Sequence, residues 1–196
     1  MRRSFRISSW AVLEPGISPD VSFVPPLVRR RLSPLQKIFF SLAKSVGAEA
    51  PAQVVFSSRD GEDTLTRRIV DEFNADGSVS PNRFSSSVYN AAPGLWSVTT
   101  GNREPYTAVA AGDDSIECGL LEALSGGECS VFAYAEETGG GYGAAFKAEA
   151  TGAEGREAVA QEGDPSRPPI GFGALVDFLA GKVPSLEGRW ITLRYA

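Results

Sequence analysis

Apolar residues recur at helical spacing in two segments of the first half of the chain. At residues 35–46 the apolar positions fall on one face, at steps of three and four residues. Ser33 suits the N-cap of this helix and Pro34 its first position. The same spacing returns at residues 63–73. The sequence therefore predicts two amphipathic helices that each bury one side.

Short runs of β-branched, aromatic and alternating apolar residues predict strands around these helices. We expect strands at residues 4–12, 54–57, 106–111, 130–135, 144–150 and 189–195. A short helix is expected at 174–180. Because helices alternate with strands, the pattern favours an α/β domain with a largely parallel sheet and an antiparallel edge. A chain of 196 residues is expected to form one domain over residues 1–196.

Two segments interrupt this pattern. Residues 87–98 have helical spacing but carry Pro93 and Gly94 in their middle, so we expect a distorted helix. Residues 151–169 are polar and rich in Gly, Glu and Pro, which predicts a mobile or disordered loop.

A sharp turn separates the strand at 106–111 from the next helix. Gly112, Asp113 and Asp114 form this turn, and apolar residues at helical spacing follow from Ile116 onward. Asp114 can serve as N-cap, with Glu117 as its capping-box partner. A strand, a tight elbow and a helix form the local geometry in which many enzymes present a nucleophile.

Composition narrows the function classes. The hydrophobic content of 42% and charged content of 22% are ordinary for a globular protein, and the net charge of −5 argues against nucleic acid and anionic membranes as partners. No apolar run reaches the roughly 18–20 residues of a membrane span. The chain has no histidine and only two cysteines, Cys118 and Cys129. We therefore expect no metal, no cofactor, no disulfide framework and a cytoplasmic location.

Four motifs, in this order and spacing, resemble the N-terminal half of β-ketoacyl synthases, which have the thiolase-like fold. They are Arg29–Leu32 with Ser33–Pro34, VVFSSRDGE at Val54–Glu62, FSSSVYNAAPGLWSV at Phe84–Val98 and AAGDDSIECGLLEAL at Ala110–Leu124. The chain is most similar to the short stand-alone proteins of this family that are related to chain-length factors. The resemblance implies a layered αβα half with a mainly parallel mixed sheet.

The chain departs from active ketosynthases where their chemistry resides. Their elbow carries a cysteine, and the resemblance puts Gly112 at that position. Their two basic partners, histidines in most members, come from a C-terminal half that we do not expect here. The positive end of the helix instead faces Asp113 and Asp114, whose charges stabilise it by ~0.3–1 kcal/mol apiece. We expect a vestigial elbow at Gly112, Asp113 and Asp114, and no catalytic residue.

The resemblance implies an accessory role in a fatty-acid, aryl-polyene or polyketide-type pathway. The chain would bind a ketosynthase or a second copy of itself, an acyl-carrier protein, or an acyl chain. Phe84 and Trp96 are candidates for an acyl pocket, although plain core positions explain them more simply. Arg29, Arg30 and Arg31 are candidates for docking an acidic carrier protein, although a solvated surface would also explain them.

Two other functions stay open at this point. One is an acyltransferase or thioester hydrolase that uses Asp113 or a nearby serine. The other is a structural binding module unrelated to lipids. For the accessory protein, we expect the apolar face of the elbow helix (Ile116, Leu120, Leu121, Leu124) to lie uncovered, because a full synthase covers it with its second half. That face predicts a dimer or complex that buries more than ~1,000 Å².

Overall fold

The structure is a computed structural model that describes residues 2–150 and 154–196. Its eight strands are β1 (Arg2–Leu13), β2 (Gln53–Ser57), β3 (Tyr106–Val109), β4 (Cys129–Glu136), β5 (Tyr142–Glu149), β6 (Arg156–Glu162), β7 (Ser185–Glu187) and β8 (Ile191–Tyr195). Its helices are α1 (Pro26–Arg29), α2 (Pro34–Ser45), α3 (Asp63–Asp76), α4 (Pro81–Ser86), α5 (Ala91–Thr100), the 3-10 helix η1 (Gly112–Asp114), α6 (Ser115–Ser125) and α7 (Phe172–Leu179).

All eight strands form one mixed sheet in the order β3-β2-β4-β5-β1-β6-β8-β7. This confirms the α/β class. Only β2 runs parallel to its neighbours, β3 and β4, and the other paired strands are antiparallel. The expectation of a mainly parallel sheet was therefore wrong, because most of the strand pairs are antiparallel. Hairpin connections in the second half of the chain extend the antiparallel part well beyond an edge.

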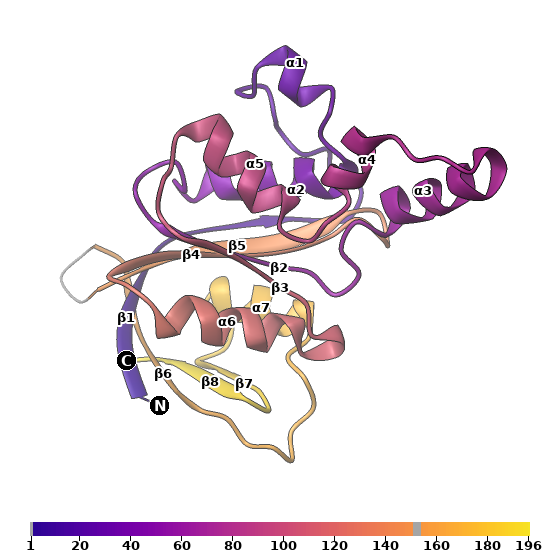
Figure 1. Cartoon of the computed structure of the whole chain (residues 1–196). Helices are drawn as coiled ribbons and strands as arrows, with labels where there is room; N and C mark the ends of the chain where they lie inside the picture. Colours follow the sequence, from indigo (N-terminus) through magenta and orange to yellow (C-terminus); the bar gives the residue numbers. More distant parts are fainter. Residues whose placement is uncertain (1, 151–153) are drawn as a thin grey trace.

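Helices cover both faces of the sheet (Figure 1). α2 and α5 lie on one face, and α6 and α7 lie on the other. α2 begins as predicted, with a capping box in which Ser33 and Gln36 bond each other's backbone N–H groups. Below it, Phe39, Phe40 and Trp96 pack edge to face with centroid distances of 5.2–6.0 Å. These contacts form the core on that face.

The distorted helix predicted at residues 87–98 is instead a break followed by a regular helix. α4 ends at Ser86, and α5 begins at Ala91. Pro93 therefore lies in the first turn of α5, where the backbone N–H groups have no hydrogen-bond partner within the helix. The proline costs no hydrogen bond there, so the helix needs no kink.

The apolar face of α6 is buried within the same chain, mainly against strands β2 and β4 and in one cluster with the C-terminal segment. Ile116, Leu120 and Leu124 are only 4%, 0% and 1% exposed. They belong to one buried cluster with Phe178 of α7 and Leu193 of β8. The expected uncovered face is therefore wrong, because residues 156–196 occupy the place that we assigned to a missing second half.

Glu117 fixes this cover in position. It is fully buried, and its carboxylate accepts hydrogen bonds from the backbone N–H groups of Ile170 and Trp190, at 3.0 and 2.6 Å. The predicted capping box is absent, since Asp114 makes no side-chain cap and pairs with Arg189 at 3.4 Å. Both acidic residues at the start of α6 thus hold the C-terminal segment.

The predicted loop at 151–169 contains a strand of seven residues, β6, which pairs with the first half of β1. Residues 151–153 lie outside the described residues. β1 is long enough to serve two partners, because its second half pairs with β5 and its register shifts between Ile7 and Ser9. This long strand joins the antiparallel C-terminal strands to the rest of the sheet.

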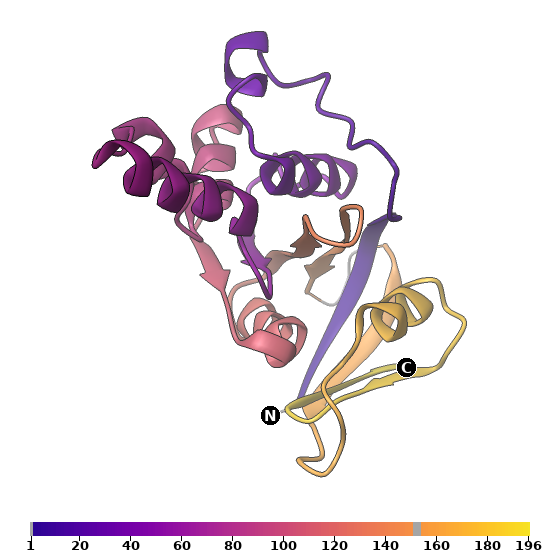
Figure 2. The same ribbon diagram turned by 90° about the vertical axis from the view of Figure 1, so that its right-hand side faces the viewer.

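α3 and α4 extend from the body on the side of α2 and α5 (Figures 1 and 2). Neither helix contains a buried residue. Residues 63–86, which we call the arm, therefore expose the apolar stripe that the sequence predicted to be buried. Val70 and Phe73 of α3 and Phe84 of α4 are all more than half exposed.

Candidate functional site

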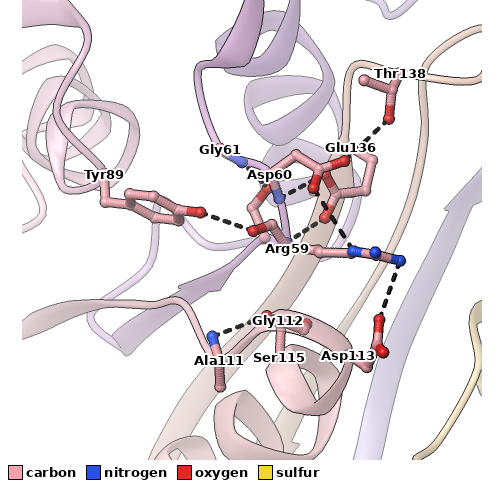
Figure 3. Close-up of polar contacts among 11 residues, drawn as sticks. Arg59, Asp60, Gly61, Tyr89, Ala111, Gly112, Asp113, Ser115, Glu136 and Thr138 are labelled. Carbon is pink, nitrogen blue, oxygen red and sulfur yellow. Dashed lines mark hydrogen bonds and ion pairs between the residues drawn. The ribbon is translucent and has the colours of Figure 1, made fainter. Parts of the chain in front are cut away.

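The predicted bend between strand and helix is present at residues 106–124. β3 ends at Val109, η1 makes the turn, and α6 follows directly. Ser115 holds the turn: its Oγ accepts a hydrogen bond from Ala111 N at 3.0 Å and donates one to Gly112 O at 2.7 Å (Figure 3). The serine hydroxyl is therefore engaged in keeping the elbow closed.

Gly112 adopts a left-handed backbone conformation with φ +58°, and a Cβ built there meets no atom within 4 Å. Open space thus lies where an elbow side chain would project. A nucleophile at this position would be accessible, but the residue present offers no reactive group. The bend is present, and its glycine offers no reactive side chain.

Charged groups around Gly112 are paired with one another (Figure 3). The guanidinium of Arg59 lies 3.0 Å from Asp113 and 3.6 Å from Asp60. The side chains of Arg59 and Asp113 are 58% and 70% exposed, so their ion pair contributes little stability. Behind them, Glu136 accepts hydrogen bonds from the N–H groups of Arg59 and Asp60, and its burial raises its pKa.

Cys118 lies one turn along α6 from the elbow and does not supply the missing thiolate. Burial raises the pKa of its thiol, and the nearby charges of Asp114 and Glu117 raise it further. A nucleophilic cysteine needs the opposite shift. Among the described residues near the bend, we find neither an activated thiol nor a base to assist one.

The two residues predicted for an acyl pocket do not meet. Trp96 is 1% exposed, packs inside the aromatic core and donates its indole N–H to Ala48 O at 3.3 Å. Phe84 lies on α4 and is 61% exposed. The structure gives no support to a pocket shared by these two side chains. Trp96 follows the core alternative that the sequence left open.

A cleft of about 810 Å³ lies between α1, the start of α2 and the helices α3–α5. Its apolar walls come from Val28, Leu65, Val88, Leu95 and Val98. Two of the three predicted docking arginines, Arg30 and Arg31, line it, whereas Arg29 does not. Arg68 of α3, which the sequence did not single out, also lines the cleft.

Of the four arginines that line this cleft, one forms an ion pair and three form none with any residue that the structure describes. Arg83 forms an ion pair with Glu72 of α3. Within residues 2–150 and 154–196, Arg30, Arg31 and Arg68 form no ion pair. The cleft therefore combines an apolar wall with uncompensated positive charge, which suits an amphipathic anion or an acidic protein surface.

A buried carboxyl group lies behind the cleft, and no local pattern in the sequence indicates it. Glu62 is 4% exposed, and its Oε1 accepts hydrogen bonds from Ser33 Oγ at 2.8 Å and Gln36 Nε2 at 2.9 Å. Burial raises the pKa of Glu62 to about 7, and the charge of Glu137 contributes to the rise. In the sequence, Glu62 is only the last residue of the VVFSSRDGE motif, and nothing local marks it as buried.

A comparison with models of known protein families gives one match. The family model described as "Beta-ketoacyl synthase, N-terminal domain" matches residues 8–128, which is more than half of the chain. The chain belongs to this family. A search of curated proteins finds no match.

Solved structures with the same fold include ketosynthase complexes. One is described as a ketosynthase (ApeO) in complex with its chain length factor (ApeC) from Xenorhabdus doucetiae. A chain of that complex matches with a TM-score of 0.76 and 20% identity, over 99% of both chains. A chain of the ishigamide ketosynthase/chain length factor matches with a TM-score of 0.63 and 14% identity, over 92% of this chain and 72% of that one. At these identities the likeness establishes the thiolase-like ketosynthase fold.

A third match comes from AntDE:AntF, a type II PKS acyl-carrier protein in complex with its ketosynthase. It has a TM-score of 0.58 and 8% identity, over 77% of this chain and 64% of that one.

Among the helices of the described residues, none combines the length and the hydrophobicity of a membrane-spanning helix.

Proposed function

We propose that this chain is a non-catalytic, ketosynthase-like accessory protein that acts as a chain-length-factor-like partner of a ketosynthase. The observation that carries the proposal is the elbow at Gly112, which keeps the bend and open space of an active site but has no nucleophile. The family membership and the ketosynthase complexes with the same fold support the same role. The pathway would be of the fatty-acid, aryl-polyene or polyketide type.

The surface best suited to a ketosynthase lies around β3 and the helices α3–α5. β3 is the terminal strand of the sheet, so one side of its backbone has no strand partner. Val98 of α5 is 83% exposed, and Tyr106 of β3 is 42% exposed. This surface takes over the role that we first gave to the face of α6. An interface there should bury more than ~1,000 Å² in total.

The cationic cleft supports a second contact, with an acyl-carrier protein or its acyl group. Arg30, Arg31 and Arg68 would attract an acidic carrier surface, and the apolar wall behind them would accept an alkyl chain. This contact belongs to the accessory role, since it positions a substrate without reacting with it.

Co-purification tests the partnership. The chain is co-expressed with a cysteine-bearing ketosynthase encoded beside it, and the complex is measured by affinity capture and sedimentation. We expect a stable complex, and we expect Val98→Glu to reduce it at least tenfold because a buried unpaired charge is costly at an interface. Ile17→Glu, at a residue that is 59% exposed on another loop, should leave it unchanged.

A monomer at micromolar concentration, both with and without the ketosynthase, would contradict the proposed partnership. A self-associated dimer that Val98→Glu also breaks would keep the interface but assign it to a second copy.

An acyltransferase or hydrolase gains no support from the site. Ser115 is buried and occupied by the turn, and Asp113 is paired with Arg59. An acyl-thioester analogue separates the two functions, because the accessory role predicts no covalent adduct at residues 112–115. An adduct there, located by mass spectrometry, would favour the enzyme.

A further inference from the structure

The arm, residues 63–86, is attached to the body almost entirely through its two ends. α3 and α4 contain no buried residue, and the ion pair between Arg83 and Glu72 joins them to each other rather than to the sheet. Figures 1 and 2 both show α3 at the periphery of the molecule. Whatever holds the arm in place must therefore act at its ends.

One side chain of α2 ties both ends together. Gln36 Nε2 donates to Glu62 Oε1 at 2.9 Å, where the arm begins, and to Ser86 O at 3.2 Å, where it ends. Gln36 is only 1% exposed. Buried hydrogen bonds of this kind hold their partners firmly because water does not compete for them. Glu62 and Gln36 thus form the attachment point of the arm.

This attachment is incomplete in one specific way. Oε2 of Glu62 and Oε2 of Glu137 are both buried, and neither has a hydrogen-bond partner among the described residues. The other oxygen of Glu137 accepts from Thr64 N at 2.6 Å, which holds Glu137 against the first turn of α3. A carboxylate is only an acceptor, whereas a protonated carboxyl group also donates. One proton on Glu62 would therefore provide a donor where two buried acceptors have none.

The charged groups around Glu62 do not neutralise it. The neighbours from α2, Ser33 and Gln36, are uncharged. At the end of β4, Glu137 adds a like charge, and Glu136 is occupied by the N–H groups of Arg59 and Asp60. In the arm, Arg67 pairs with Asp63 at 2.7 Å and Arg83 pairs with Glu72. The arginines of the cleft (Arg30, Arg31 and Arg68) line the same cleft as Ser33 and Gln36, but the only side chains among the described residues that bond Glu62 are Ser33 and Gln36.

We propose that Glu62 and Glu137 form a proton-operated latch that holds the arm over the cationic cleft. With a proton on Glu62, both ends of the arm are bonded to the body, and the cleft keeps the volume and the lining residues given above. When the proton leaves, two like charges remain at the root of the arm, and the arm opens so that water can solvate them. This inference concerns the chain alone and does not depend on the proposed ketosynthase partner.

The direction of the pH effect follows from where the proton binds best. Burial raises the pKa of Glu62 to about 7 in the closed form, while a solvated glutamate titrates near its ordinary value of about 4.3. The closed form therefore binds the proton more tightly between these two values. Opening is favoured as the pH rises through this window, by up to roughly tenfold per pH unit, and levels off above about pH 7.

Hydrogen–deuterium exchange of the purified full chain tests the latch. Peptides from residues 64–86 and from α6 are measured at pH 5.5 and 7.5 and corrected for intrinsic exchange rates. We expect protection of the arm to fall by about tenfold or more at the higher pH while α6 is unchanged. Glu62→Gln carries a permanent donor in place of Oε2 and should abolish the pH dependence. Glu104→Gln, at an exposed glutamate, should behave as the wild type.

A second variant separates the latch from a general effect of the fold. Glu137→Gln removes the like charge and offers a donor to Glu62, so the arm should stay protected to a higher pH than in the wild type. Equal pH dependence in the wild type and Glu62→Gln would overturn the latch. So would a parallel loss of protection in α6, or an arm whose protection ignores pH.

Discussion

α3 and α6 carry similar apolar stripes but meet different fates. On α6, Ile116, Leu120 and Leu124 are buried in one cluster with residues of the sheet and of the C-terminal segment. On α3, Phe73 remains 56% exposed, and no residue of the helix is buried. The periodicity of a sequence tells which side of a helix is apolar, but it does not tell what covers that side.

The difference moves the expected interface from one side of the sheet to the other. A full two-half synthase led us to expect an open α6, yet its apolar face packs on β2 and β4 and residues 156–196 complete the same cluster. The surface left for a partner is therefore the one around α3, α5 and the edge strand β3, where exposed apolar residues gather. Exposed apolar patches of this kind commonly mark interaction sites.

Removing one large side chain from each stripe should change the free energy of unfolding by very different amounts on the two helices. Leu120→Ala leaves a cavity in a fully buried cluster and should lower the free energy of unfolding by ~2–5 kcal/mol. Phe73→Ala removes a half-exposed ring and should change it by no more than about 0.5 kcal/mol. Urea unfolding followed by tryptophan fluorescence measures both. Equal losses would mean that α3 is buried in solution, for instance by self-association.

The cover of α6 should depend on Glu117. Its two oxygens accept from Ile170 N, Trp190 N and Ile191 N, and a glutamine can present only one accepting oxygen. Glu117→Gln should therefore cost ~1–3 kcal/mol by leaving a buried N–H group without a partner. Hydrogen exchange at residues 170 and 190–195 should accelerate as well. Glu128→Gln, at an exposed site, provides the control, and an unchanged exchange pattern would show that packing alone holds the cover.

Local signals in the sequence sufficed where structure is set by near neighbours. Ser33 and Pro34 start α2 as predicted, because capping depends on residues within one turn. The bend at Gly112 is also present, because glycine readily adopts the left-handed conformation that this turn uses. The strand predicted at residues 4–12 is likewise present as part of β1, where Phe5 and Ile7 alternate inward and are only 1% and 3% exposed.

Features that depend on contacts between residues far apart in the chain could not be predicted from the sequence. β6 has only small or polar residues around Val159, and its pairing with β1 makes it a strand. Gln36 and Glu62 lie 26 residues apart, and Glu117 meets Trp190 across 73 residues. No local pattern reports such encounters. The attachment of the arm and the cover of α6 were both invisible for this reason.

Two glycines with the same left-handed backbone conformation provide the finest comparison of the helices. Gly112 before α6 and Gly77 after α3 have φ values of +58° and +66°, and a Cβ at either position meets no atom within 4 Å. Alanine should therefore cost each site about 1 kcal/mol from the left-handed backbone alone. At Gly112 this cost should lower the free energy of global unfolding, because α6 is part of the core.

At Gly77 the same cost should appear locally. α3 has no buried residue, so its last turn can open without disturbing the sheet. Gly77→Ala should therefore reduce hydrogen-exchange protection at the end of α3 and leave the urea midpoint of the whole chain unchanged. If both substitutions lowered global stability equally, α3 would have to unfold together with the body. The contrast between a covered and an uncovered helix would then fail, and with it the freedom of movement that the latch requires.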